Sequence, residues 1–218
     1  MNIYIIFFIS LLAVSTSCRS QEINWRQQLA HPHLLSMQAG ADYSSWVGAS
    51  YAYRLSEERP LMFSASLEVP FGNRLLDDWK GSMAGHYEIW HSNEVSWDVQ
   101  AGLSMRTYQS DVASLTNLGL DLRTGIGYYG KFWGIAGLIG YDHAFATHIR
   151  HAHLKESYPG IWDGWIGATG GNIQAGIRLN YSSESWHTFL TIGKTVGQDL
   201  QNHPTLPFFL QLSLAKSL

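Results

Sequence analysis

The chain has 218 residues, of which 45% are hydrophobic, 13% are aromatic and only 14% are charged. A soluble domain usually has about 25% charged residues, so this composition indicates that part of the surface does not face water. The formal net charge of −3 excludes the strongly basic surface of a nucleic-acid-binding protein, and the hydrophobic content excludes an intrinsically disordered chain.

The first segment in chain order is the apolar run 3–14, IYIIFFISLLAV, which small residues follow. It has the length of the hydrophobic region of a secretory signal peptide and is too short to span a membrane as a helix. We therefore expect a signal peptide at 1–17. Cys18, the only cysteine, is either the acylated first residue of a lipoprotein or is removed on export. Neither outcome leaves a pair of cysteines for an internal disulfide.

After a short polar segment at 18–33, expected to lie in the periplasm, apolar and polar residues alternate. This period is that of an extended strand with two unlike faces. In VSWDVQAGLSMR, for example, Val95, Trp97 and Leu103 lie on one face, and Asp98 and Arg106 lie on the other. Ten such segments predict ten strands, at 34–43, 46–55, 61–69, 81–90, 95–106, 117–128, 132–141, 172–181, 186–194 and 207–214.

The connectors between these segments differ in length in a regular way. The even-numbered connectors, 56–60, 91–94, 129–131 and 182–185, are short. The odd-numbered ones are longer after the first, and they include 70–80, 109–116, 142–171 and 195–206. Because odd and even connectors of an up-and-down sheet lie at opposite ends, one end has short turns and the other has long loops. This asymmetry is typical of outer-membrane barrels.

Charged residues lie almost entirely on the faces opposite the apolar ones. These faces carry four acids and four arginines, namely Arg54, Glu68, Glu88, Asp98, Arg106, Asp121, Arg123 and Arg178. The apolar faces carry only Lys194 and Lys216, each near a strand end. We therefore expect the apolar faces to point outward to lipid and the charges to point inward.

Aromatic residues gather at the expected strand ends, as in the girdles of membrane barrels. One girdle is predicted from Trp97, Trp133, Trp186, Tyr53, Trp90, Tyr128 and Tyr181, and the other from Tyr43, Trp46, Tyr108 and Tyr141. A soluble barrel with apolar residues inside would leave this distribution unexplained.

Together, residues 34–218 resemble the small outer-membrane β-barrel proteins of Gram-negative bacteria. The resemblance rests on architecture, and it implies a closed antiparallel up-and-down transmembrane barrel of about ten strands in the outer membrane. It also implies contact with outer-membrane lipid and lipopolysaccharide, and insertion by the barrel assembly machinery. One departure is the C-terminus, PFFLQLSLAKSL, because such proteins commonly end in an aromatic residue.

The inward charges form the first candidate site. Neighbouring strands supply a polar network in the lumen, for which we predict Glu88, Asp98, Arg106, Asp121, Arg123 and Arg178. A ten-stranded barrel is narrow, so the network is expected to act as a salt-bridged plug, with a conduction path or small-ligand site as the alternative. The predicted role is therefore structural, narrow-channel or surface-interaction, in a monomer without cofactor or catalytic machinery.

The second candidate site is the long connector 142–171, which is rich in histidine. Neutral imidazole is a common transition-metal ligand, and His148, His151 and His153 are the candidates for a metal site. No strict metal motif such as HExxH is present, so no metal is predicted. The alternative function is an outer-membrane hydrolase or a metal-binding barrel that uses this extracellular loop.

Overall fold

The structure is a computed structural model that describes residues 31–42, 44–56, 60–71, 77–110, 112–151, 155, 158–168, 170–197 and 207–218. The expected signal peptide at 1–17, Cys18, most of the segment 18–33, and Tyr43 and His153 lie outside the described residues. No helix among the described residues is long and apolar enough to cross a membrane.

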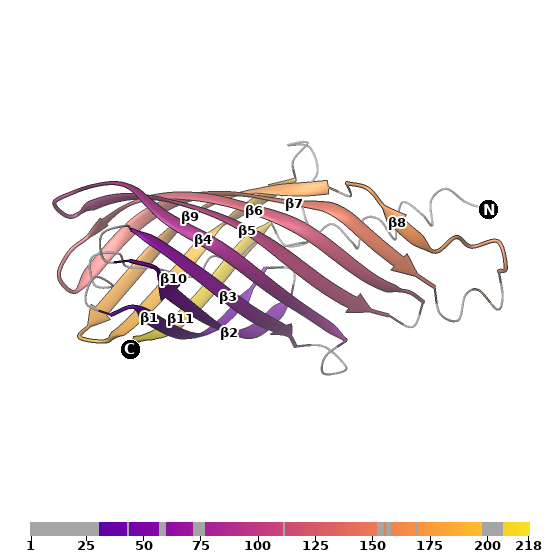
Figure 1. Cartoon of the computed structure of the whole chain (residues 1–218), viewed down its shortest axis with the longest axis horizontal. Helices are drawn as coiled ribbons and strands as arrows, with labels where there is room; N and C mark the ends of the chain where they lie inside the picture. The colour runs from indigo at the N-terminus through magenta and orange to yellow at the C-terminus, as the bar shows by residue number, and fades with distance from the viewer. Residues whose placement is uncertain are drawn as a thin grey trace.

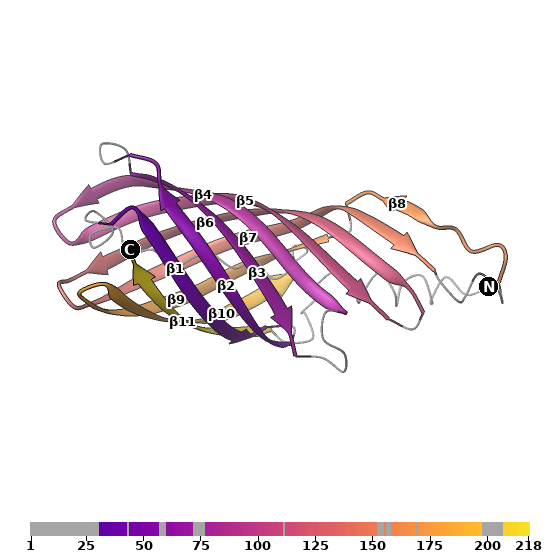
Figure 2. The same ribbon diagram turned by 60° about the horizontal axis from the view of Figure 1, so that its bottom comes forward.

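Ten strands close into an antiparallel barrel, and an eleventh, short strand is added at its rim (Figures 1 and 2). The strands are β1 (His33–Ala41), β2 (Ser45–Arg54), β3 (Leu61–Pro70), β4 (Asp78–Ser92), β5 (Val95–Gln109), β6 (Ser114–Tyr129), β7 (Trp133–Arg150), β8 (Gly164–Ile166), β9 (Gly170–Ser183), β10 (Trp186–Gly197) and β11 (Phe208–Ser217). Pairing of β1 with β11 and of β6 with β7 completes the ring, and within the described part of the chain β8 pairs only with β7. The predicted fold class and the ten predicted strands are confirmed.

The two ends of the barrel differ as the connectors predict. At the inner end, where β1 begins and β11 ends, two-residue turns join β4 to β5 and β9 to β10. Their first residues, Asn93 and Glu184, have φ values of 52° and 51°, the left-handed conformation that tight hairpin turns require. At the outer end, β4 to β7 are longer than the neighbouring strands and extend past the rim of β1 to β3 (Figure 1).

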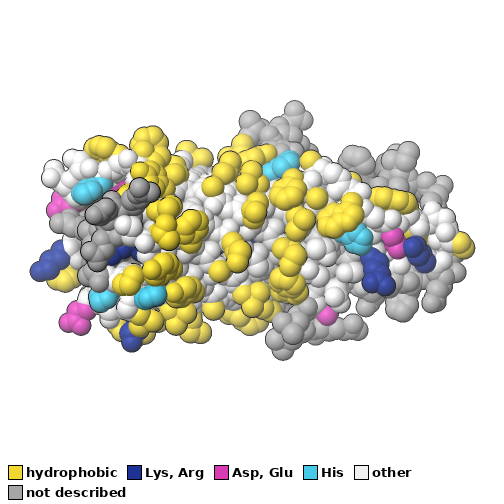
Figure 3. Space-filling view, viewed as in Figure 1, with side chains coloured by type: hydrophobic (Ala, Val, Ile, Leu, Met, Phe, Trp, Pro, Cys, Tyr) yellow, Lys and Arg dark blue, Asp and Glu magenta, His cyan; other side chains and the backbone are white. Residues whose placement is uncertain are grey.

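Apolar side chains cover the outside of the barrel. Leu103 and Ile177 on this face are 60% and 51% exposed, whereas Asp121 and Arg178 on the inner face are each 4% exposed. In Figure 3 the apolar side chains form a broad band around the middle, and the coloured charged side chains lie toward the two ends. Since closure pairs the backbone of every barrel strand on both sides, the barrel is built to sit in lipid with its polar face inside.

The aromatic girdle at the inner end is present, with one irregularity that the alternation does not predict. Trp97, Trp133 and Trp186 are exposed there, and so are Tyr53, Tyr128 and Tyr181. A β-bulge at Ile89 lets Glu88 pair with Asp98 while Trp90 pairs with Trp97. The bulge shifts the side-chain period by one residue, so that Ile89 and Trp90 both face outward.

The prediction that Trp46 belongs to the outer girdle is wrong. Trp46 is only 1% exposed and shares the inward face of β2 with Ser50. Its ring covers Gly40 so closely that a Cβ on that residue would lie 2.3 Å from it. The strand period therefore places Trp46 inside the barrel, whereas exposed Val47 is the neighbour that faces lipid.

The predicted loop 142–171 is wrong in part, because its two ends and a short segment within it are strand. β7 continues from the predicted end at 141 to Arg150, and β8 folds back onto it. A second bulge leaves Phe145 without a partner on β6, since Leu118 pairs with Ala146 and Gly119 with Ala144. This bulge interrupts the period of two, so the regular alternation in the sequence ends shortly after Tyr141.

Candidate functional site in the barrel interior

A row of serines crosses the inner wall on five adjacent strands. Ser36, Ser50, Ser66, Ser82 and Ser104 lie directly opposite one another in sequence along β1 to β5. Neighbouring hydroxyls bond to each other in two places, Ser36 with Ser50, and Ser66 with Ser82 at 2.6 Å. The register thus brings five short hydroxyl side chains into one continuous polar strip.

The strip is more accessible on one side of the barrel than on the other. Ser66, Ser82 and Ser104 are half-buried, whereas Ser36 and Ser50 are buried beneath Gln38, whose side-chain amide donates to Ser50 at 2.9 Å. Two adjacent inward rows of β3 to β5 hold only small side chains, Ser64, Ala84 and Gly102 in one row and Ser66, Ser82 and Ser104 in the other. These side chains reach only a short way toward the axis, whereas the inward residues next to them, such as Glu68, Lys80 and Arg106, are longer. Along these two rows the wall of β3 to β5 therefore leaves more room in the lumen than the wall of β1 and β2, where Leu34 and Gln38 lie on the inward face.

Apolar side chains narrow the lumen at the inner end. Five inward residues of β1, β2, β3, β10 and β11 form a buried cluster: Leu34, Ala52, Met62, Phe189 and Ala215. A second cluster on β6 and β7 contains Tyr129, Ala136 and Leu138. These residues were missed from the sequence because the polar face was expected to be polar throughout. The charged residues Glu88, Asp98 and Arg178 lie on β4, β5 and β9, the barrel strands that contribute to neither cluster.

Four of the six predicted network residues lie together in this inner half. Glu88 and Asp98 face each other across β4 and β5, and Ser96 donates a hydrogen bond to Glu88. Arg178 and Arg123 lie close enough to act electrostatically on Asp98. The side chain of Arg123 also reaches over Gly140 and donates to Gln174 at 3.3 Å. Two acids and two arginines thus share one section of the lumen.

The other two predicted residues lie elsewhere. Arg106, near the outer end of β5, forms an ion pair with Asp78, with its Nε donating to Oδ1 at 2.9 Å. Asp78 was missed because it falls in the predicted connector 70–80, although it is the first residue of β4. The structure therefore separates Arg106 from Glu88 and Asp98.

Asp121 faces a second acid that sequence reasoning did not assign to the lumen. Its partner across β6 and β7 is Asp142, and both are buried. The amide of Asn172, on β9, donates to Asp142 at 3.1 Å. Asp142 was assigned to the connector because its strand was predicted to end one residue earlier. Its inward position follows from the alternation once β7 is extended.

A small hollow opens on the lumen toward the outer end. It is lined by Asp42, Trp46, Arg123, Gln174, Phe209 and Gln211, among others. The ring of Phe209 lies over two glycines, since a Cβ on Gly193 or Gly176 would come within 2.4 and 2.9 Å of it. Aromatic rings that lie flat against the wall in this way take up little of the bore.

The histidine candidates do not converge on one point. His148 packs against Trp165 with ring centroids 5.0 Å apart, and His151 bonds through Nδ1 to Asp163 at 2.9 Å. Among the described residues no group of three or more His, Cys, Asp or Glu side chains is placed to hold a metal ion. Hydrogen bonds from Lys155 and from the His151 backbone hold the pKa of Asp163 well below its usual range.

An apolar exterior, a closed ring of strands and a polar, charged interior define an integral outer-membrane β-barrel. Among solved structures, the chain is similar to the KdgM porin, with 10% identity and a TM-score of 0.43 over 85% of this chain and 99% of that one. It is also similar to the N-terminal β-barrel domain of Pseudomonas aeruginosa OprF (10% identity, TM-score 0.38, 86% and 98% covered). A third similar structure is the outer membrane protease OmpT from Escherichia coli (6% identity, TM-score 0.46, 86% and 94% covered).

No protein-family model matches the sequence, and no curated protein matches it. With such identities and TM-scores, the three structural likenesses assign neither a substrate nor an activity to this chain.

Proposed function

We propose that this barrel is a narrow channel that lets small polar solutes cross the outer membrane. The observation that carries the proposal is the inner wall of β3 to β5, where Ser66, Ser82 and Ser104 are opposite one another and half-buried. Short hydroxyl side chains leave space toward the axis and exchange hydrogen bonds with a passing solute. No catalytic step and no cofactor belong to this proposal.

The narrowest part of the passage would set its selectivity. Glu88 and Asp98 lie on one wall, and Arg178 acts on Asp98 from β9. Charged side chains at a constriction select permeating ions by sign. With the two acids balanced by Arg123 and Arg178, we expect weak selectivity between cations and anions.

The second candidate function is that of a sealed structural barrel. It is favoured by the buried apolar cluster of Leu34, Ala52, Met62, Phe189 and Ala215 at the inner end. Apolar constrictions exclude water from a pore. If the cluster and the charged residues fill the whole section, the barrel anchors its outer strands without conducting.

Conductance of the refolded protein in a planar lipid bilayer distinguishes these functions. The test variant is Ser82→Phe, which places a large ring in the lumen, and the control is Met83→Phe, which places the same ring on the lipid face, where Met83 is 71% exposed. We expect small, steady conductance steps in the wild type and in Met83→Phe, and a clear reduction in Ser82→Phe. Migration of each variant in gels before and after boiling shows whether it has folded.

A wild-type protein that is folded but never conducts would contradict the channel and support the sealed barrel. Ion selectivity gives a second measurement. Replacing Glu88 and Asp98 by their amides should move the reversal potential in a salt gradient toward anion selectivity. Replacing Arg123 and Arg178 by glutamine should move it the opposite way, and an unchanged potential in both would exclude these residues from the passage.

A further inference from the structure

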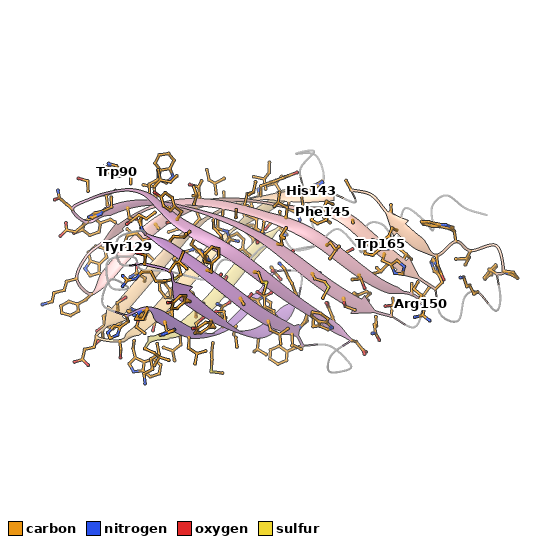
Figure 4. The ribbon with its side chains drawn as sticks, viewed as in Figure 1. Trp90, Tyr129, His143, Phe145, Arg150 and Trp165 are labelled. Carbon is orange, nitrogen blue, oxygen red and sulfur yellow. The ribbon has the colours of Figure 1, made fainter. Side chains whose placement is uncertain are left out.

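A short arm extends from the outer end of the barrel. It consists of the last part of β7, from Phe145 to Arg150, and of β8, whose Trp165 pairs with His148. Figures 1 and 2 show this arm beyond the rim, and Figure 4 shows Phe145, Trp165 and Arg150 following one another along it. The channel proposed above does not use the arm.

The height of the arm above the membrane follows from strand geometry. A strand that rises about 3.3 Å per residue and is tilted by about 40° climbs roughly 2.5 Å of membrane depth per residue. From Trp133 in the inner girdle to His148, β7 therefore climbs about 35 Å, whereas the apolar band of such barrels is about 25 Å tall. A bilayer has about 30 Å of hydrocarbon and about 40–45 Å including its headgroups, so His148 and Trp165 lie roughly 5–10 Å above the hydrocarbon layer, at the level of the lipid headgroups.

The outward face of the arm continues the lipid-facing surface of the barrel. Met105, Leu118 and Ala146 form one outward row on β5, β6 and β7. The outward row above it consists of Thr107, Thr116, His148 and Trp165, each opposite the next. The surface therefore changes from apolar to amphipathic without a break, and Arg150 follows two residues beyond His148 on the same side.

Side-chain contacts hold the arm in shape. Asp163 accepts hydrogen bonds from the backbone and the ring of His151, both at 2.9 Å, and forms an ion pair with Lys155 at 2.6 Å. Trp162 lies against Gly164, where a Cβ would come within 2.4 Å of its ring. Trp162 and Trp165 are nevertheless 61% and 56% exposed, so both indoles are presented to the surroundings.

We propose that the arm binds the phosphorylated saccharide headgroups of lipopolysaccharide in the outer leaflet around the barrel. Indole rings are favoured where an apolar layer meets a wet one, and the C–H faces of sugar rings stack against them. The exposed guanidinium of Arg150 suits a phosphate group, which it can bind through two parallel hydrogen bonds. The continuity of this face with the lipid-facing belt favours lipid over a soluble partner or a second copy of the chain.

Two single-cysteine reporters test the proposal in a Cys18→Ser background. Gly167 directly follows β8, two residues after Trp165, and Gly160 lies in the connection between β7 and β8. A Cβ at either glycine meets open space, so the two reporters are Gly167→Cys and Gly160→Cys. Each full-length protein is folded in detergent, labelled with an environment-sensitive fluorophore and titrated with lipopolysaccharide or with phosphatidylcholine. We expect saturable protection of the label at 167 from iodide with lipopolysaccharide only, and a smaller response at 160.

Two further variants test whether the response comes from contact with Arg150 and Trp165 or only from the bulk of the lipopolysaccharide sugars around the label. In the Gly167→Cys protein, Arg150→Ser should weaken the response about fivefold, the effect of one arginine at an anionic surface. Trp165→Ser should weaken it further, and dephosphorylated lipopolysaccharide should reproduce the effect of Arg150→Ser. Equal responses at 160 and 167, or responses that neither variant changes, would overturn the proposal. Protection that depends on protein concentration alone would instead indicate contact between copies through the open edge of β8.

Discussion

An arginine on the outer face of β5 tests whether that face is in lipid. Leu103 is 60% exposed there and lies six residues beyond Trp97 of the inner girdle. At roughly 2.5 Å of depth per residue, this places it about 15 Å into an apolar band about 25 Å tall, near the membrane midplane. Thr107, on the same face, lies about 10 Å farther out, at the outer boundary.

The expected costs follow from these depths. An arginine on the lipid face of a barrel costs about 2–4 kcal/mol at the midplane and about 0–1 kcal/mol near an interface. Leu103→Arg should therefore shift the folding equilibrium by roughly 30- to 700-fold, since about 1.4 kcal/mol corresponds to a factor of ten. Thr107→Arg should shift it by less than about tenfold on the same scale.

The measurement is reversible unfolding by urea in phospholipid vesicles, followed by tryptophan fluorescence, for the wild type and both variants. If the outer face of β5 were in water, the cost of an arginine would not depend on its position along the strand. Equal costs at the two positions, or no cost at Leu103, would refute the conclusion that this face contacts hydrocarbon.

Three further predictions concern packing, the outer arm and metal. Gly193→Ala should destabilise the barrel by about 1–3 kcal/mol, as overpacking does, because its Cβ would lie 2.4 Å from a backbone oxygen and from an aromatic ring. The control is Gly137→Ala, whose Cβ would have nothing within 4 Å, and it should leave the stability unchanged in the same urea assay. The folded-state pKa of Asp163 is depressed, so its ion pair stabilises the arm at any pH above the ordinary carboxyl pKa of about 3.9 and is lost only when the pH falls well below that value. A spin label on the connection between β7 and β8 should therefore stay immobile at pH 4.5 in the wild type and become mobile in Asp163→Asn. Zinc titration should give the same result for the wild type and for the His148→Ala/His151→Ala double variant. Zinc binding by the wild type alone would contradict the finding that these two histidines have separate partners and do not share a site.

The alternation of side chains predicts the barrel well because each strand has one face in lipid and one in the lumen. It fails where a bulge inserts one residue, at Ile89 and at Phe145. Pairing with a neighbouring strand creates a bulge, and no local pattern in the sequence marks it. The second bulge hid the outer part of β7, and Asp142, which lies just before it, was left out of the interior for the same reason.

The candidate site was predictable only in part. Alternation shows that Arg106, Asp121 and Arg178 point inward, but it does not show at which depth each one meets its neighbours. Depth depends on the register between strands, which pairs Asp121 with Asp142 and places Arg106 beside Asp78. Trp46 shows the same limit for aromatics, since its place near a strand end suggested the girdle while its parity directs it inward.

Register also explains why the serines form a rising row on the inner wall and not a ring at one height. Strands in such a barrel are tilted by about 40°, so residues directly opposite one another on successive strands climb along the axis. With neighbouring strands about 4.8 Å apart, the four steps from Ser36 on β1 to Ser104 on β5 rise roughly 12 Å, about half of the apolar band. A ring at one height would make a single constriction, whereas this ramp places hydroxyl groups in succession along the axis of the proposed channel. Serines that are far apart in the sequence thus form one row only in the folded barrel. A large side chain in the middle of the row, at Ser82, should interrupt it.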